Sequence, residues 1–209
     1  MRVVSKNVPV YDNRQQRYVD ASLLENVDLV RIAKTSREWS IERKKNKEAI
    51  LAAGLALPEH SHWDWELKAK QAEMFSGFQT LFAIECEGEI EGLMIVDFAM
   101  FLAKLPPDKE KSILYISYIE TAPHNLYEEP RHYKGIGYTL YRTAVQYSLD
   151  KQCEGRVGLH SLPQAEEFYG KRCQMTPLDK DSSHQNLRYF ESTQEQSRHV
   201  LTVTQDSPS

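Results

Sequence analysis

The chain has 209 residues, a formal net charge of -4 at pH 7 and 41% hydrophobic residues. This length is sufficient for one domain with a buried core, with or without additions. A mildly acidic chain has no general attraction for nucleic acid or for an anionic membrane surface, so neither is expected as a partner.

The sequence also argues against a membrane span, a disulfide framework and a metal site. No apolar run approaches the ~18 residues that a spanning helix needs, and the N-terminus has no apolar signal segment. Cys86, Cys153 and Cys173 include no C-x-x-C pair, which favours reduced thiols and a cytoplasmic location. His60 and His62 have no convincing further ligands near them, so no metal is expected.

The first third of the chain predicts a mixture of strands and helices. Two short extended pieces lie within 8–19, around a turn, and are a possible hairpin. The segment 27–32 alternates imperfectly and is compatible with a strand. Helices are then expected over 36–55 and 61–74, each with the serine at its start as the cap.

The centre of the chain predicts the core of a sheet. Strands are expected over 80–86 and 90–98, joined by the tight turn Glu87-Gly88-Glu89. In 113–119 both alternating sets of side chains are largely apolar, which is typical of a strand buried on both faces. An amphipathic helix follows over 136–150.

The last part predicts a strand over 155–160, a helix over 163–171 that begins with a proline, and a strand over 187–191. The segment 192–209 is polar and without periodicity, so a frayed tail is expected. This order of elements predicts a mixed sheet with helices on both faces.

Between the buried strand and the amphipathic helix, Gly135 and Gly137 flank Ile136. Glycine lets a backbone approach a ligand closely. The first amides of a helix lack internal partners, and the helix dipole favours an anion there. Lys134 and Arg131 add positive charge, so the segment is a candidate phosphate-binding loop.

Three local patterns, in this order, resemble the GNAT superfamily, the Gcn5-related N-acetyltransferases. The strand 113–120 leads into His132-x-x-Gly135-x-Gly137, although the family usually has Gln or Arg where this chain has His132. The segment 155–162 resembles the family's fifth strand. The segment 164–171 resembles its Ala-x-x-Phe-Tyr helix.

The resemblance implies an α/β GNAT fold. Its central sheet is mixed and mostly antiparallel, with splayed parallel strands four and five and helices on both faces. The acyltransferase domain would extend over 21–191. An N-terminal extension over 1–20 would precede it, and the polar tail over 192–209 would follow.

The resemblance also implies acetyl-CoA as the cosubstrate, in the gap between the fourth and fifth strands. Its pyrophosphate would lie on the amides of 132–137, and its pantetheine would pair with the fourth strand like an added edge strand. For Ser161, a role in a turn is the alternative to cofactor binding. The expected cofactor-binding residues are Tyr118, Ile119, Thr121, His132, Tyr133, Lys134, Gly135, Ile136, Gly137, Tyr138 and Ser161.

Amide formation from a thioester needs a neutral amine, a polarised carbonyl and a proton for the departing thiolate. Glu120 is the candidate base, with a salt-bridged or solvent-facing strand end as the alternative. The resemblance implies that Tyr169 is the acid, with a packed core aromatic as the alternative.

The leading hypothesis is therefore an N-acetyltransferase that acts in a ternary complex, as a monomer or homodimer, on an amine of a small molecule or peptide. The competing hypothesis is a non-catalytic GNAT-fold module that binds acyl-CoA as a sensor or interaction protein.

Overall fold

The computed structural model describes residues 4–52, 54, 57, 59–127 and 132–202. Within this range no helix is both long and apolar enough to cross a membrane. The chain divides into two compact units, which are described one at a time. The first comprises Met1–Ser76, Thr80–Leu93 and Glu120–Gly137, and the second comprises Gly77–Gln79, Met94–Ile119 and Tyr138–Ser209.

The described residues form nine strands of one mixed sheet. The strand order is β6-β1-β2-β3-β4 in the first unit and β4-β5-β7-β9-β8 in the second. β5 and β7 are parallel, whereas β1/β2, β1/β6, β2/β3, β7/β9 and β8/β9 are antiparallel. The expected mixed, mostly antiparallel sheet is confirmed. The strands are β1 (Val4–Asp12), β2 (Arg17–Glu25), β3 (Gln79–Cys86), β4 (Glu89–Leu102), β5 (Ser112–Thr121), β6 (Tyr133–Lys134), β7 (Val157–Ser161), β8 (Thr176–Asp181) and β9 (Leu187–Ser192).

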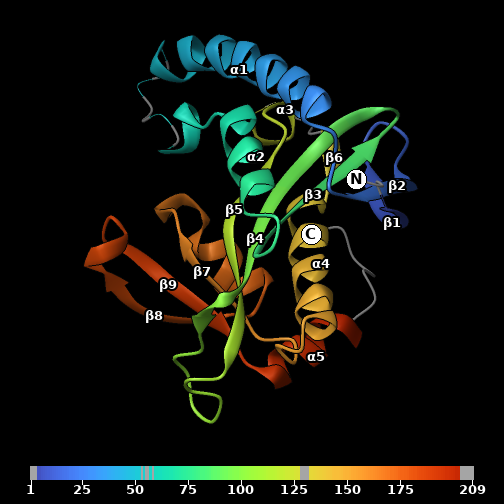
Figure 1. The fold of residues 1–209 in the computed structure, drawn as a ribbon. Helices are drawn as coiled ribbons and strands as arrows, with labels where there is room; N and C mark the ends of the chain where they lie inside the picture. Colours follow the sequence, from blue (N-terminus) through green and yellow to red (C-terminus); the bar gives the residue numbers. More distant parts are fainter. Residues whose placement is uncertain (1–3, 53, 55–56, 58, 128–131, 203–209) are drawn as a thin grey trace. The chain divides into compact units, whose positions relative to one another are not determined.

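In the first unit, β1 and β2 form a long hairpin (Figure 1). Their register runs from Val4 opposite Glu25 to Asp12 opposite Arg17. The hairpin predicted within 8–19 is therefore confirmed, and both of its strands are longer than expected. β2 continues the sheet by pairing with β3.

Helix α1 (Leu29–Ala52) corrects two predictions. The segment 27–32 is not a strand, and Ser36 is not the cap, because the helix begins seven residues before it. The Asp28 carboxylate accepts a hydrogen bond from the Val30 amide at 2.6 Å and so satisfies a donor of the first turn. Ser36 lies inside the helix and accepts from the Trp65 amide at 3.1 Å instead.

Helix α2 (Trp65–Met74) packs against α1 (Figure 1). The predicted end is confirmed, but the predicted cap Ser61 is wrong, because Ser61 lies in the preceding 3-10 helix η1 (Glu59–His62). Asp64 caps α2 and accepts from the Leu67 amide at 3.1 Å. An acidic side chain at this position also suits the helix dipole.

The central strands follow the predictions closely. β3 and β4 are joined at Glu87 and Gly88, which have φ of 52° and 89°, as a tight turn requires. In β5, Ile113, Leu114, Tyr115 and Ile116 are all buried. The prediction of a strand buried on both faces is confirmed for that half, and 117–119 are partly exposed.

Helix α4 (Ile136–Asp150) has the predicted limits, with Ile136, Leu140 and Ala144 buried along one stripe. In the second unit, β5 pairs with β7 at Leu114–Val157 and Tyr115–Gly158. No later pair between these strands occurs among the described residues, although β5 continues to Thr121 and β7 to Ser161. The two strands thus part as the splayed arrangement requires.

The C-terminal part departs most from expectation. The helix predicted over 163–171 consists of the 3-10 helix η2 (Pro163–Ala165) and the π-helix η3 (Phe168–Arg172). Strand β8 and helix α5 (Gln194–Thr202) were not predicted, and neither was the short helix α3 (His124–Tyr127) in the middle of the chain. The expectation of no regular structure after 192 is wrong over 194–202, and 203–209 lie outside the described residues. α5 is mostly polar and buries only Ser197 and Val200, so its sequence resembles that of a solvated tail.

Candidate functional site

Glu120 lies at the end of β5 and is 5% exposed. Its Oε1 accepts from Arg43 Nη1 of α1 at 2.7 Å, and its Oε2 accepts from Trp65 Nε1 of α2 at 2.5 Å. Arg43 Nη2 also donates to the Trp63 carbonyl at 2.8 Å. Both oxygens of the carboxylate are therefore engaged, as burial of a charge requires.

Two effects oppose each other at Glu120. Burial raises the pKa of Glu120, while the charge of Arg43 and the hydrogen bond from Trp65 oppose the rise. Because the guanidinium lies in direct contact, we treat the two groups as a buried ion pair. His60 Nε2 lies 3.6 Å from Glu120 Oε1. Burial, followed by Arg43 and His62, lowers the pKa of His60 to about 4, so its ring is neutral at pH 7.

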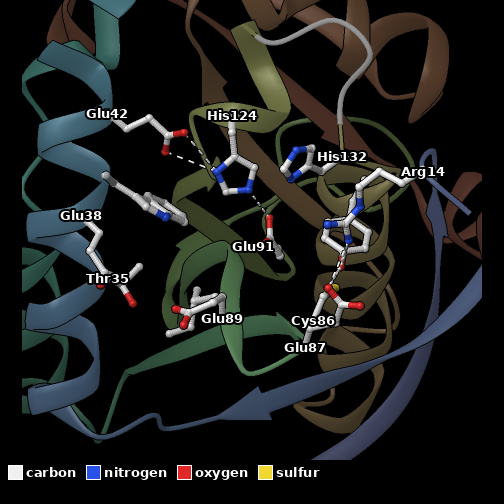
Figure 2. Close-up of a pocket in the computed structure, with 13 residues that line it drawn as sticks. Arg14, Thr35, Glu38, Glu42, Cys86, Glu87, Glu89, Glu91, His124 and His132 are labelled. Atoms are coloured by element: carbon white, nitrogen blue, oxygen red, sulfur yellow. Dashed lines mark hydrogen bonds and ion pairs between the residues drawn. The ribbon is translucent and has the colours of Figure 1, made fainter. Parts of the chain in front are cut away.

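A second group of side chains in the first unit surrounds a cavity of about 360 Å³ (Figure 2). It is strongly acidic, because α1 and the β3–β4 hairpin both direct glutamates toward it. Trp39 and Thr35 of α1 add an aromatic and a hydroxyl surface. The acidic residues that line it are Glu38, Glu42, Glu87, Glu89 and Glu91.

His124 of α3 bridges two of these glutamates (Figure 2). Its Nε2 lies 2.7 Å from Glu91 Oε2, and its Nδ1 lies 3.3 Å from Glu42 Oε2. Burial lowers the pKa of His124, but the hydrogen bonds and charges of Glu42 and Glu91 outweigh it and raise the value to about 10. His124 is therefore a cation at pH 7.

The cations in and around the cavity do not balance its carboxylates. Arg14 Nη2 contacts Glu87 Oε2 at 3.1 Å. Lys34 Nζ lies 3.4 Å from Glu89 and 3.6 Å from Glu38, and its side chain is 57% exposed. With protonated His124, three cations face five carboxylates, so the cavity suits a positively charged ligand.

The predicted phosphate loop divides into two parts. Tyr133 and Lys134 form β6 and pair with Asp12 and Tyr11 of β1. The Tyr133 amide donates to Asn125 Oδ1 at 2.9 Å, so this amide is already engaged. Arg131 lies outside the described residues.

The second part of the loop is the entrance to α4. Gly135 has φ of +87°, and nothing lies within 4 Å of where a Cβ would be. The left-handed backbone therefore favours glycine at this position, and the missing side chain leaves open space beside it. α4 begins at Ile136, so the first amides of the helix lie directly after this glycine.

No protein-family model and no curated protein matches the chain. Among solved structures, an uncharacterized protein from Bacillus halodurans is 12% identical and has a TM-score of 0.57 over 93% of each chain. RimJ from Mycobacterium smegmatis, solved in complex with CoA-disulfide, is 13% identical, with a TM-score of 0.49 over 96% of this chain and 93% of that chain. A predicted acetyltransferase from Clostridium acetobutylicum, solved with acetyl-CoA, is 14% identical, with a TM-score of 0.44 over 73% of this chain and 88% of that chain.

At these identities the likeness concerns the fold, which the chain shares with the Bacillus halodurans protein.

The remaining predicted site residues lie in two kinds of environment. Tyr118, Ile119 and Thr121 of β5 are partly exposed. Ser161 is buried, and its Oγ donates to the Leu162 carbonyl at 2.9 Å, which fits the alternative role in a turn. Tyr138 is buried in the first turn of α4.

Tyr169 lies in η3 in the second unit and is 5% exposed. Its ring centroid is 5.1 Å from that of Phe168 and 5.9 Å from that of Phe190. Burial, with added effects of Cys173 and Tyr141, raises the pKa of Tyr169. A proton on this hydroxyl is therefore retained at pH 7, as a general acid requires, and the packing also fits the core-aromatic alternative.

The sequence does not point to Arg43 or the glutamate cavity as parts of a site. Arg43 belongs to the basic run 43–45, which is typical of a solvated helix face, yet it is 8% exposed. One signal was available. Glu38 and Glu42 stand four residues apart on α1, a spacing that places two carboxylates on the same helix face.

Proposed function

We propose that the chain is an N-acyltransferase that transfers an acetyl group from acetyl-CoA to an amine by direct attack in a ternary complex. The observation that carries the proposal is the unit made of β5, left-handed Gly135 and α4, in this order along the chain, together with the parting of β5 from its parallel partner β7 after Tyr115. In the GNAT resemblance, this unit is where acyl-CoA lies.

In the proposed complex, the pyrophosphate binds the amides at the start of α4. These amides lack intrahelical partners, and the helix dipole favours an anion. Because the Tyr133 amide is engaged by Asn125, we assign most of the pyrophosphate binding to the amides of Gly135, Ile136 and Gly137. His132, Tyr133, Lys134 and Tyr138 would complete the binding segment, and Tyr118, Ile119 and Thr121 would line the pantetheine.

The acidic cavity supports a cationic amine as the acceptor. Carboxylates attract an ammonium group, and the Trp39 ring that lines the cavity offers a favourable surface for a cation. The amine must lose a proton before it attacks the thioester. We assign proton acceptance to Glu120 and protonation of the departing thiolate to Tyr169.

A second candidate function is a non-catalytic module that binds acyl-CoA. The specific observation in its favour is that Arg43 and Trp65 engage both oxygens of Glu120. Two such donors stabilise the charged form of the carboxylate and so make it a weaker proton acceptor.

Calorimetric titration with acetyl-CoA, followed by a thiol-release assay, tests both functions. The amines should include spermidine, free lysine and a short peptide with a free N-terminus. We expect stoichiometric binding and release that is fastest with the most highly charged amine. Binding without release from any amine would favour the module, and failure to bind acetyl-CoA would rule out both.

Gly135→Asp tests the loop assignment. The added side chain is strained at positive φ, and its charge repels pyrophosphate, so we expect at least a tenfold loss of acetyl-CoA affinity. Gly54→Asp is the matched control, because Gly54 also has positive φ and open surroundings. Equal affinity of the two variants would contradict the assignment.

Tyr169→Phe tests the proposed acid. We expect slower thiol release with little change in acetyl-CoA affinity, because only the hydroxyl is removed. Tyr141→Phe removes another buried hydroxyl of the second unit and is the control. Unchanged rates across the pH range would remove Tyr169 from the reaction.

A further inference from the structure

Three potential metal ligands meet in the second unit, although the sequence alone predicts no metal site. His160 is on β7, Asp181 ends β8, and His184 lies in the 3-10 helix η4 (Ser182–His184). Each offers one ligand atom, and these atoms all lie within 4.8 Å of one another. β7 and β8 both pair with β9, so the sheet brings together residues that are 21 positions apart.

Two of the three distances between the ligand atoms suit a tetrahedral metal site. His160 Nε2 lies 3.2 Å from Asp181 Oδ2, and His184 Nδ1 lies 3.3 Å from the same oxygen. Nitrogen and oxygen ligands about 2.0–2.1 Å from a tetrahedral zinc ion are about 3.3 Å apart. We propose that His160, Asp181 and His184 bind a divalent transition-metal ion of the zinc class, with the remaining position open to water.

Neighbouring groups orient two of the three ligands. His160 Nδ1 lies 2.7 Å from the Tyr115 hydroxyl, which leaves Nε2 to face Asp181. Tyr115 is itself held by Phe101, whose ring is stacked on it with centroids 4.0 Å apart. Hydrogen bonds of this kind, from the second ring nitrogen of a histidine, are typical of metal sites.

The two oxygens of the Asp181 carboxylate also have different partners. Its Oδ1 accepts from the Ser183 amide at 2.9 Å and from Ser183 Oγ at 2.6 Å. Its Oδ2 faces the two histidines. This arrangement aims one oxygen at the proposed ion and fixes the other.

His184 is the ligand that must move. Its ring is stacked on that of His160, with centroids 3.9 Å apart and planes 6° apart. An ion lies close to the plane of each imidazole that binds it, and two parallel rings cannot share one such ion. His184 therefore has to turn, and because its side chain is 43% exposed this rotation disturbs no core packing.

Lys104 is a competing cation. Its Nζ lies 3.6 Å from Asp181 Oδ2 and 4.2 Å from the centroid of the Tyr189 ring. A divalent ion at this oxygen repels the ammonium group, and the 48% exposed Lys104 side chain can move into solvent. Metal binding and the Lys104 contact are therefore mutually exclusive.

The test is a calorimetric titration of chelator-treated full chain with zinc chloride. We expect one ion per chain, at least tenfold weaker binding in His184→Ala and tighter binding in Lys104→Met. His199→Ala removes an exposed histidine of α5 and should bind as the wild type does. Because His184 is exposed, its replacement leaves the fold intact.

A structural readout complements the titration. Zinc should shift the histidine-ring nitrogen resonances of His160 and His184, and those of His199 should stay unchanged. The proposal is overturned if the wild type binds no stoichiometric zinc, or if His184→Ala binds as tightly as the wild type.

Discussion

At the scale of single residues, the ion pair of Glu120 and Arg43 joins the end of β5 to α1. Glu120→Gln leaves a buried guanidinium without a counter-charge, and breaking such a pair costs about 3–5 kcal/mol. We expect the free energy of unfolding to fall by about 3 kcal/mol, measured by urea denaturation.

Two further variants show whether this loss comes from the buried charge. Arg43→Met combined with Glu120→Gln removes both partners and should recover part of the loss. Glu66→Gln breaks the exposed pair with Lys70 and should change stability by about 0.5 kcal/mol at most. If the double variant is less stable than Glu120→Gln alone, the two residues are not coupled as proposed.

His124 makes the stability depend on pH. Glu42 and Glu91 bind its two nitrogens, and the ring of His132 lies 5.3 Å away. The pKa of His124 is about 10 in the folded chain against an ordinary value of 6.5. Its contribution is therefore fully present below about pH 6.5 and is lost as the pH rises through about 10.

This dependence of the unfolding free energy on pH is measurable. Between these pH values the folded state holds a proton that the unfolded state lacks, and this lowers stability by at most about 1.4 kcal/mol per pH unit. His124→Gln should lack this component, so the difference in unfolding free energy between wild type and variant should shrink as the pH rises from 7 to 10. A constant difference would show that His124 is not protonated there.

At the scale of elements, β7 depends on the absence of a side chain at Gly158. An added Cβ would meet the Tyr189 hydroxyl of β9 and the Ile113 side chain of β5. Tyr189 is buried and cannot simply move aside. We expect Gly158→Ala to lower the free energy of unfolding by about 1–3 kcal/mol in urea denaturation.

Gly77→Ala is the control for Gly158→Ala, because nothing lies within 4 Å of where its Cβ would be. It should leave stability unchanged or raise it slightly by restricting the unfolded chain. If both variants lose the same free energy of unfolding, the added methyl group at position 158 does not clash with Tyr189 as proposed.

Elements with a strong local signal were predictable. α4 combines Gly135 directly before its start with a clear apolar stripe, and the structure has it over the predicted range. The segment 27–32 is too short for its pattern to distinguish a strand from a helix. In the structure Asp28 caps the first turn of α1, so most of this segment is helical. α5 buries two of its nine residues, so tertiary contacts such as that of Ser197 with the Gly155 carbonyl define it.

The site was less predictable than the fold, because its contacts join distant parts of the chain. Glu120 could be selected from its place at a strand end, but its partners Arg43 and Trp65 are 77 and 55 residues away. The His160 cluster arises in the same way from strand pairing. The spacing of residues along the sequence does not predict contacts of this kind.

At the scale of the whole molecule, the chain passes repeatedly between the two units. β4 and β5 each contribute residues to both. Unfolding one unit alone would break both strands part-way along their length and expose buried residues of each. We therefore expect a single cooperative transition in urea, although the compact units are two.

The distribution of tryptophan and cysteine allows each unit to be followed separately. Trp39, Trp63 and Trp65 are the three tryptophans and all belong to the first unit. Of the three cysteines, Cys86 alone is in the first unit, so a Cys86→Ser variant leaves buried thiols only in the second. Buried thiols react with a thiol reagent only when their surroundings open.

Tryptophan fluorescence and thiol labelling, measured on this one variant, should give the same midpoint, which should also match that of far-UV circular dichroism. The shared strands are the reason, because each reporter loses its environment only when β4 and β5 are lost. A fluorescence transition at lower urea than the labelling transition would instead mean that the first unit, with Glu120 and the acidic cavity, opens independently. The acceptor side of the proposed enzyme would then be the less stable part of the molecule.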